Sequence, residues 1–387
     1  MERVVLHCDM DNYFASVEEK HNPALRDVPF AVCGDPEMRH SIVMARNAAA
    51  KKAGVVAGIS FAQAKQICPN LEYVKADLAK YLAETKCARE VYRKYSDNII
   101  PYGLDESWAI LEDGASMDEA RQIADLIRLE IMYSLGLSAS VGVSFNLVFS
   151  KLGSDLNKPN GTTVITRDNY KQLVWPLSAD ELLFVGAARK KVLANAGINT
   201  IGGIAAAPPE KLAKLLGKVG RDLWSFANGD DAGFDPVVDE IGSIGNTITP
   251  PEDLRCDDDA SAVLYLLASA VCARLKKHGL QAKCVSVCTR DSDFNKTIRQ
   301  CALGHLTDNA GEIFNCAFGL FKRHYNWERP LRSIGVRVDN LDERRQMSLF
   351  DDDCGNGPQA EISQRVKDLT KKFGALNFEK SAKAWEE

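Results

Sequence analysis

The sequence predicts an α+β protein of several domains, built from two sheets that each carry their own helices. Residues 1–165 and 244–345 both place short apolar strands and amphipathic helices in a βαββαβ order. Between these regions, from about residue 168, the chain changes to small helices with glycine-rich turns. A chain of 387 residues is too long for one ordinary core, so roughly two to four domains are expected.

The composition is that of a globular chain, with 45% hydrophobic and 26% charged residues. The formal net charge is −5, so the chain as a whole has no basic field that would indicate nucleic-acid binding. A local basic surface for nucleic acid is still compatible with this charge. The 11 cysteines are scattered without a CxxC pair, which favours a reducing cytoplasm over a disulfide framework. No apolar run reaches ~18 residues, so we expect no membrane span. Acidic residues arrive by residue 9, so we expect no leader peptide.

The first 165 residues predict a sheet with helices between its strands. The partial alternation of polar and apolar residues over 2–9 predicts a strand. Residues 12–23 predict a short helix that ends at Asn22 and Pro23. Asn47 and Ser60 are expected to begin two further helices. The remaining expected elements are strands at 28–33, 41–45, 99–104, 107–111 and 137–143, and helices at 77–95 and 117–136.

The order of these elements predicts a particular sheet once residues 19–77 are set aside. Strand, helix, strand, strand, helix, strand is a split βαβ (ferredoxin-like) arrangement, which we expect to carry its helices on one face. Residues 19–77 would then be an insertion after the first helix.

The middle of the chain repeats a glycine turn that precedes a helix. Residues 182–205 predict helix, turn and helix, and residues 214–231 repeat a shorter version. Such turns offer backbone N–H groups to a phosphate at a helix start. The basic residues near these turns are Arg189, Lys190, Lys191 and Lys218.

Residues 229–245 resemble a linker in composition, and a second βαββαβ pattern follows them. Its helices are expected at 259–278 and 308–324. The region 244–345 carries 15 Lys and Arg against 13 Asp and Glu, so it is locally basic. The basic residues alternate with apolar ones, which fits either a solvated sheet face or a sheet lying across phosphates. They are Lys283, Arg290, Lys296, Arg299, Arg332 and Arg337.

Four carboxylates are candidates for a metal site. Asp9 and Asp11 share a face if their strand continues that far, and the hairpin with Asp105 and Glu106 should lie beside that strand. Carboxylates this close repel one another, so the cluster calls for a cation. Hard oxygen ligands select Mg²⁺ or Mn²⁺, and two such ions serve in-line phosphoryl transfer. The alternative is that both pairs are acidic turn residues.

Three lysines are candidates for binding phosphate. Lys158 follows the last predicted strand of the first sheet, from which a lysine side chain can reach a triphosphate. Lys51 and Lys52 belong to the inserted segment and can close on the same phosphates. The alternatives are a turn lysine for Lys158 and a solvated helix face for the other two.

Five sequence motifs, taken in order, resemble those of a known protein family. CDMDNYFASVE, YGLDES, SASVGVSFN, SDLNKPNGTTVI and SIGNTITPPEDL, in this order, resemble the Y-family translesion DNA polymerases of the bacterial DNA polymerase IV type. The resemblance covers about residues 3–350 and implies a right-hand polymerase. Its implied parts are a palm (1–18 and 78–165), fingers (19–77), a helix-hairpin-helix thumb (166–232), a linker (233–243), a little finger (244–345) and a tail (346–387).

The resemblance implies template-directed DNA synthesis past damaged bases, without proofreading, in DNA damage tolerance and repair. Asp9, Asp105 and Glu106, helped by the carbonyl of Met10, would be the ligands of two Mg²⁺ ions. The primer 3′-hydroxyl would attack the α-phosphate of the incoming deoxynucleotide.

The resemblance also assigns roles around the substrates. Phe14 matches a steric gate against ribonucleotides, Tyr13 would pack beside the triphosphate, and Lys51 and Lys158 would bind it. The residues expected to contact DNA are Arg189, Lys190, Lys218, Arg290, Arg299, Arg332 and Arg337.

The peptide QMSLF, residues 346–350, resembles the bacterial sliding-clamp-binding peptide. Gln346, Leu349 and Phe350 would fill an apolar pocket on the clamp, although so short a match also arises by accident. The expected partners are therefore primer-template DNA, deoxynucleoside triphosphates and the clamp, for a cytoplasmic monomer that binds no membrane.

Four residues, at three places in the chain, depart from the family pattern. Ala48 and Lys51 stand where Tyr and Arg usually hold the triphosphate, and a lysine lacks the bidentate grip of an arginine. Leu147 stands where a Lys is common, and Phe184 replaces the first Gly of the first thumb hairpin. We expect a weaker grip on the nucleotide than in typical members, with Arg46 as a residue that compensates.

Two rival functions remain at this point. A non-catalytic, clamp-tethered accessory protein on the same fold would lose the carboxylates, which this chain keeps. A nucleotide cyclase would use the palm and its metals but has no use for a helical thumb, a basic second sheet or a clamp peptide.

Overall fold

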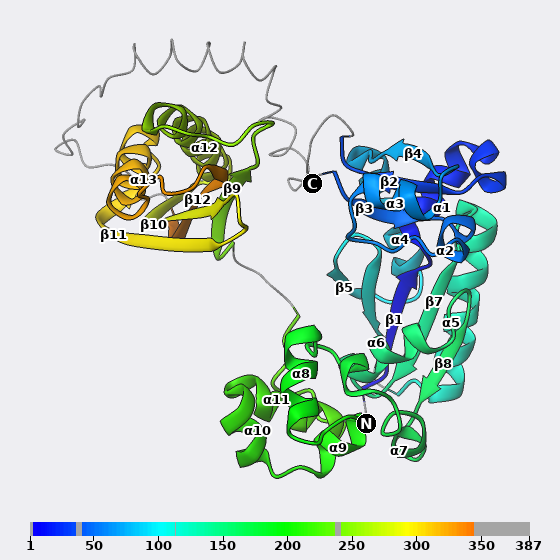
Figure 1. Cartoon of the computed structure of the whole chain (residues 1–387). Helices are drawn as coiled ribbons and strands as arrows, with labels where there is room; N and C mark the ends of the chain where they lie inside the picture. The colour runs from blue at the N-terminus through cyan, green and yellow to red at the C-terminus, as the bar shows by residue number, and fades with distance from the viewer. Residues whose placement is uncertain (1–2, 36–40, 113, 237–240, 344–387) are drawn as a thin grey trace. The chain divides into compact units, whose positions relative to one another are not determined.

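The computed structural model describes residues 3–35, 41–112, 114–236 and 241–343. These residues form two compact units, one up to residue 236 and the other from residue 241, and each is described by itself (Figure 1). In the described ranges, no helix combines the length and apolarity that crossing a membrane requires.

The first unit is built on a five-stranded sheet with its earliest strand in the centre. The strand order is β5 (Asn98–Tyr102), β6 (Glu106–Ile110), β1 (Val5–Met10), β7 (Ala139–Ser144) and β8 (Thr162–Ile165). β1 is antiparallel to β6 and β7, as the split βαβ prediction requires. β8 was not predicted; it has four residues, and such short runs are ambiguous in sequence.

Helices cover both faces of this sheet, so the prediction of one covered face is wrong. α4 (Leu78–Arg93) and α5 (Met117–Glu130) pack on the face of β1 that carries Leu6 and Cys8. A π-turn extends α5 to Leu135, and Gly136 ends it at φ +65°. α6 (Leu147–Leu156) packs on the opposite face, where a Cβ at Gly142 of β7 would lie 1.9 Å from the carbonyl oxygen of Ser150.

The close approach of α6 to β7 leaves no space for a side chain at Gly142. We expect Gly142→Ala to destabilise the protein by about 3 kcal/mol or more, because the clash is with helix backbone rather than a side chain that can turn away. Urea unfolding measures this loss. Gly186→Ala is the control, since Gly186 has an ordinary φ of −78° and open space around it. Equal stability of the two variants would contradict the packing argument.

A small three-stranded sheet follows α1 (Tyr13–His21). Its order is β3 (Val43–Arg46), β2 (Phe30–Cys33) and β4 (Glu72–Lys75), the last not predicted. α2 (Ala48–Lys52) begins at the predicted N-cap Asn47, whose side chain accepts from the N–H of Ala50. α3 (Phe61–Ile67) begins at the predicted N-cap Ser60, which forms a capping box with Gln63.

Small helices complete the first unit around a core that they share with α6 and β8. They are α7 (Tyr170–Leu173), α8 (Ala187–Asn195), α9 (Ile201–Ala206), α10 (Pro209–Leu216) and α11 (Lys218–Ala227). Phe184 adopts a φ of +70°, and its ring packs against Phe226 and Phe234. Phe234 also packs against Trp108, so the start of the segment predicted as a linker is held to this unit.

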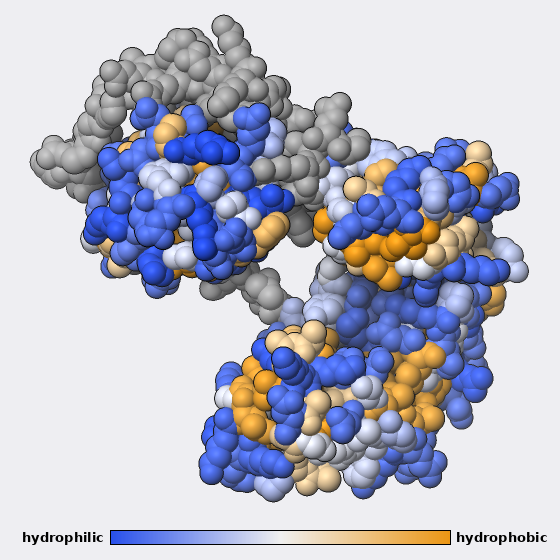
Figure 2. Space-filling view, in the orientation of Figure 1, coloured by the Kyte–Doolittle hydropathy of each residue, from blue (hydrophilic) through white to orange (hydrophobic). Residues whose placement is uncertain are grey.

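The second unit confirms the predicted βαββαβ order. Its elements are β9 (Ser243–Ile248), α12 (Asp257–Lys277), β10 (Leu280–Asp291), β11 (Lys296–Thr307), α13 (Ala310–His324) and β12 (Leu331–Glu343). The sheet is antiparallel, in the order β11, β10, β12, β9. The helices cover the face of Val285 and Val338, and the residues in view in Figure 2 are mostly hydrophilic on this unit.

Candidate active site

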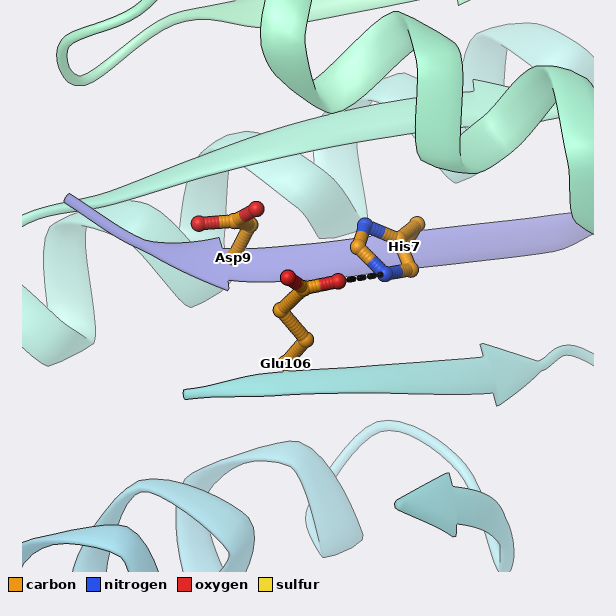
Figure 3. A group of neighbouring side chains, drawn as sticks. All are labelled: His7, Asp9 and Glu106. Atoms are coloured by element: carbon orange, nitrogen blue, oxygen red, sulfur yellow. Dashed lines mark ion pairs between the residues drawn. The ribbon is translucent and has the colours of Figure 1, made fainter. Parts of the chain in front are cut away.

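The β1–β6 pairing brings the predicted carboxylates together. Asp9 lies directly opposite Glu106, and Asp105 sits in the turn just before β6, where its carbonyl accepts the N–H of Met10 at 3.0 Å. Figure 3 shows Asp9 and His7 on β1 facing Glu106, and these three side chains each offer a ligand atom within 4.8 Å of the others. An open cleft of about 330 Å³ lies here, lined by Asp9, Met10, Asn12, Tyr13, Phe14, Met44, Ala45, Arg46, Asp105, Glu106, Lys151, Asp155 and Lys158.

Asp9 is buried beside a single lysine. The ammonium of Lys158 lies 2.8 Å from Oδ2 of Asp9 and 2.8 Å from Oδ1 of Asp155. Burial raises the pKa of Asp9 to about 7, and the attraction to Lys158 only partly opposes this rise. Burial opposes ionisation of Lys158 too, but the two carboxylates outweigh it and hold its pKa above the usual value. The positive charge of Lys158 therefore does not fully offset the cost of ionising Asp9 in its buried position.

Glu106 has a different environment from its two neighbours. Its Oε2 lies 3.2 Å from Nε2 of His7 and forms an ion pair with Lys151. Burial alone would raise the pKa of Glu106, but the contacts with His7 and Lys151 outweigh it and lower the pKa to about 2. Burial, followed by the charge of Glu106, raises the pKa of Asp105. Of the three acids, Glu106 is thus the one held firmly ionised.

Asp11 does not join this group. β1 ends at Met10, so the alternation that would have put Asp11 on the face of Asp9 stops one residue early. Its two oxygens accept from the Ser140 hydroxyl and the Asn160 N–H, both at 2.8 Å. Asp11 therefore fastens the turn that follows Lys158 and supports the site without joining the carboxylate group.

The adjacent aromatics Tyr13 and Phe14 point to different places. Tyr13 is 3% exposed, and its hydroxyl donates to the carbonyl of Tyr81 at 2.6 Å and contacts Thr85 at 2.8 Å. That hydroxyl is engaged inside the protein and is therefore not available to a substrate. Phe14 lines the cleft, and its ring stacks on Tyr81 with centroids 4.5 Å apart.

The inserted segment contributes Arg46 rather than Lys51 to the cleft. Met44, Ala45 and Arg46 of β3 line it, while Ala48 and Lys51 lie exposed on α2 outside the lining. The prediction of weaker nucleotide binding from Ala48 and Lys51 stays a prediction.

Sequence reasoning missed His7, Lys151 and Asp155. Lys151 and Asp155 lie four residues apart on α6, and Lys158 follows three residues later, just beyond its end. This spacing places the three side chains on one side of the helix. That spacing was visible in KLGSDLNK, once the segment was known to be helical. His7, two residues before Asp9, was visible from strand alternation.

The residues predicted to bind DNA are spread over several surfaces. In the first unit, Arg189 donates to the carbonyl of Phe184 at 2.7 Å, Lys190 pairs with Asp180 at 2.7 Å, and Lys218 is exposed at the start of α11.

In the second unit, Arg290 pairs in register with Lys296, and Arg337 with Ser286, on the face away from the helices. Arg332 lies over the ring of Phe294, 4.6 Å from its centroid. Arg299 is opposite Val287, whose side chain faces the helices, so it is on the other face of the sheet.

Comparisons with known proteins agree with one another. Residues 8–155 match the impB/mucB/samB family, and residues 242–349 match the C-terminal domain of that family. A DNA polymerase IV of Acetivibrio thermocellus is 41% identical over 383 residues, covering 97% of this chain and 96% of the relative. DNA polymerase IV 1 of Bacillus subtilis is 31% identical, covering 98% and 93%.

A solved Y-family DNA polymerase chimera has the same fold. It superposes with a TM-score of 0.78 at 24% identity, covering 87% of this chain and 99% of that one. The chain therefore belongs to the Y family of translesion DNA polymerases, in the DNA polymerase IV group.

Membership of this family implies a divalent cation, and the donor set fits one. Asp9, Asp105 and Glu106 are oxygen ligands, which suit hard cations. Burial raises the pKa values of both aspartates, and a bound cation would offset that cost of ionising them. Because the carboxylates are retained, the non-catalytic accessory protein is not favoured.

Proposed function

We propose that this protein extends a primer on a DNA template by two-metal phosphoryl transfer, with Asp9, Asp105 and Glu106 and the carbonyl of Met10 as ligands of two Mg²⁺ ions. The observation that carries the proposal is the β1–β6 register, which sets Asp9 opposite Glu106 and next to Asp105. Mn²⁺ would suit the same oxygen ligands.

The side chains of the cleft then have distinct tasks. Bound divalent ions supply Lewis-acid stabilisation of the attacking 3′-oxygen and of the leaving pyrophosphate. Lys158 exchanges its carboxylate partners for the triphosphate, and Arg46 approaches the same anion from β3. α1 begins at Tyr13, and its first residues, Tyr13 and Phe14, line the cleft, where a helix start favours an anion. Phe14 occupies the space beside the sugar.

The remaining assignments extend this proposal to the whole chain. The first sheet with α4, α5 and α6 is the palm, the small sheet the fingers, the segment α7 to α11 the thumb, and the second unit a DNA-binding little finger. The clamp peptide QMSLF, with Gln346, Leu349 and Phe350, lies outside the described residues and stays a proposal. So do the monomeric state and the cytoplasmic location.

Primer extension tests the proposed activity directly. With Mg²⁺, all four deoxynucleotides and a 5′-labelled primer-template, we expect extension that depends on the template base. A chain that binds the duplex but adds no nucleotide would leave the accessory-protein alternative, and release of pyrophosphate without a primer would point to the cyclase.

Metal binding should tighten as the pH rises. Asp9 must lose its proton to bind a cation, and burial raises its pKa to about 7, so protons compete with the metal below that pH. We expect Mn²⁺ affinity to rise up to about tenfold between pH 6 and pH 7 and less between pH 7 and pH 8. Mn²⁺ titration followed by electron paramagnetic resonance measures this without turnover.

The Lys158→Met variant is the control for the direction of this effect. Lys158 lowers the pKa of Asp9, so its removal should move the pH dependence to higher pH. An Mn²⁺ affinity that is flat between pH 6 and pH 8 would contradict the assignment of Asp9 as a ligand.

A further inference from the structure

The tip of the β10–β11 hairpin presents an aromatic ring to solvent. Phe294 lies in the turn between the two strands and is 59% exposed. Single exposed apolar residues are common on protein surfaces and by themselves indicate no site. Phe294 differs from such residues in two respects, its backbone conformation and the cation that lies over its ring.

Phe294 adopts a left-handed backbone conformation. Its φ is +66°, which is strained for a side chain of this size and is ordinarily taken by Gly or Asn. Asp291 holds the turn in place, because its Oδ1 accepts the N–H groups of Asp293 and Asn295, both at 2.9 Å. The carbonyl of Asp291 also accepts the N–H of Phe294 at 3.0 Å. A hairpin that only had to turn would favour Gly or Asn at this position, so Phe294 is better explained by what its ring contacts.

A guanidinium covers part of this ring. Cζ of Arg332 lies 4.6 Å from the ring centroid of Phe294, within the range of a cation–π contact. The cation restrains the ring from one side, and an exposed fraction of 59% leaves the remaining surface of the side chain to solvent. The hairpin tip therefore offers a restrained aromatic surface with a positive charge beside it.

The charges around the hairpin tip favour a polyanionic partner. Both acids of the turn, Asp291 and Asp293, pair with Arg329, at 3.5 and 3.0 Å. Arg290 and Lys296 pair in register at the base of the hairpin, and both are exposed. Together with the guanidinium over the ring, they place positive charge next to an aromatic surface. Proteins that bind single-stranded nucleic acid combine these two features, the charge for phosphates and the ring for bases.

We propose that Phe294 stacks on an unpaired base of single-stranded DNA, while the basic residues beside it contact the neighbouring phosphates. In a duplex the faces of each base are covered by its neighbours, so the ring can stack without distorting the DNA only where a strand is unpaired. The substrate of a polymerase has such bases in the template beyond the primer end. The inference rests on the proposed DNA-binding role of the second unit, and it names unpaired bases as the part of the DNA that the hairpin tip recognises.

Binding of the full chain to three DNA probes tests this proposal without turnover. The probes share one duplex and carry a short thymine overhang, an abasic overhang with the same phosphates, or no overhang. We expect Phe294→Ala to bind the thymine overhang about tenfold more weakly than the parent, as loss of one base–aromatic stack predicts. The other two probes should bind within about twofold of the parent, because neither offers a base to the ring. Fluorescence anisotropy measures the three affinities.

Two further variants separate stacking from general apolar contact. Phe294→Tyr keeps an aromatic ring and should bind the thymine overhang within about threefold of the parent. Ile298→Ala is the matched control, since Ile298 is 52% exposed on β11 of the same hairpin but has no aromatic face. It should leave the binding of all three probes unchanged. The salt dependence of binding by Phe294→Ala should equal that of the parent, because no phosphate contact is removed.

The outcomes distinguish this inference from the proposed DNA binding. Equal affinity of Phe294→Ala and the parent for the thymine overhang would overturn the stacking role. So would an equal loss on the thymine and abasic overhangs, which would assign the effect to phosphate contacts or to folding. A loss on the duplex without an overhang would indicate insertion between paired bases instead. Failure of the parent to bind any of the three probes would count against the proposed DNA binding itself.

Discussion

Asp105→Asn is expected to abolish primer extension, lowering kcat by about 10³-fold or more, while the protein keeps its fold and its affinity for DNA. Loss of a carboxylate that holds catalytic metal removes several kcal/mol of transition-state stabilisation, and about 4 kcal/mol corresponds to this factor. Single-turnover extension at saturating Mg²⁺ measures the loss in kcat, and gel shift with primer-template measures the retained DNA binding.

The same substitution should not reduce stability at neutral pH. The pKa of Asp105 is raised in the folded state, so the ionised carboxylate opposes folding as the pH rises above the unfolded value. Removing that charge should leave the melting temperature equal to that of the parent or higher. A variant that loses activity and also melts earlier would have lost its fold, and its inactivity would then say nothing about metal binding.

Asp155→Asn is the matched control for Asp105→Asn. Asp155 lines the same cleft and carries the same charge, but it pairs with Lys158 and does not lie in the β5–β6 turn that holds Asp105. We expect its kcat to stay within about tenfold of the parent, less than the change of ~4 kcal/mol expected for Asp105. Retention of more than a tenth of the parent activity by Asp105→Asn would remove Asp105 from the ligand set.

Strand alternation and element order were enough to predict the meeting of Asp9 with Asp105 and Glu106. They were not enough for Asp11, because the residue at which a strand ends is decided by tertiary partners. Here the Ser138 carbonyl accepts the N–H of Asp11, and Ser140 and Asn160 take its carboxylate. A shift of one residue in the strand end moves a side chain to another face.

α6 escaped prediction for a different physical reason. Seven of its ten residues are buried, so the segment is too apolar to show the wide polar face of a surface helix. It also packs against Gly142 with backbone contacts that no hydrophobic pattern records. Since α6 carries Lys151, the ion pair between Lys151 and Glu106 could not be predicted either.

The second sheet shows a signal that was present and misread. Lys296 and Arg299 are three residues apart on one strand, an odd spacing that places them on opposite faces. Grouping all six basic residues as one surface ignored this, and the β10–β11 register assigns Arg299 to the side of the helices.

Phe14→Ala is expected to open the cleft to ribonucleotides, reducing discrimination against them by about 10²-fold, or ~2.7 kcal/mol. Discrimination by size requires a ring that cannot move aside, and the stacking of Phe14 on Tyr81 supplies that restraint. Because Phe14 is only half-buried, its truncation should cost less stability than the 3–5 kcal/mol, roughly, of a core phenylalanine. The ratio of kcat/KM for a deoxynucleotide and its ribonucleotide counterpart measures the effect.

Tyr13→Phe separates the gate from its neighbour. It changes an aromatic next to Phe14 but removes only a hydroxyl that bonds within the protein, to Tyr81 and Thr85. We expect this variant to lose some stability and to keep the parent's discrimination, since nothing beside the sugar has changed. If Phe14→Ala keeps its discrimination within threefold of the parent, or if Tyr13→Phe loses as much, the ring of Phe14 is not what excludes the 2′-hydroxyl.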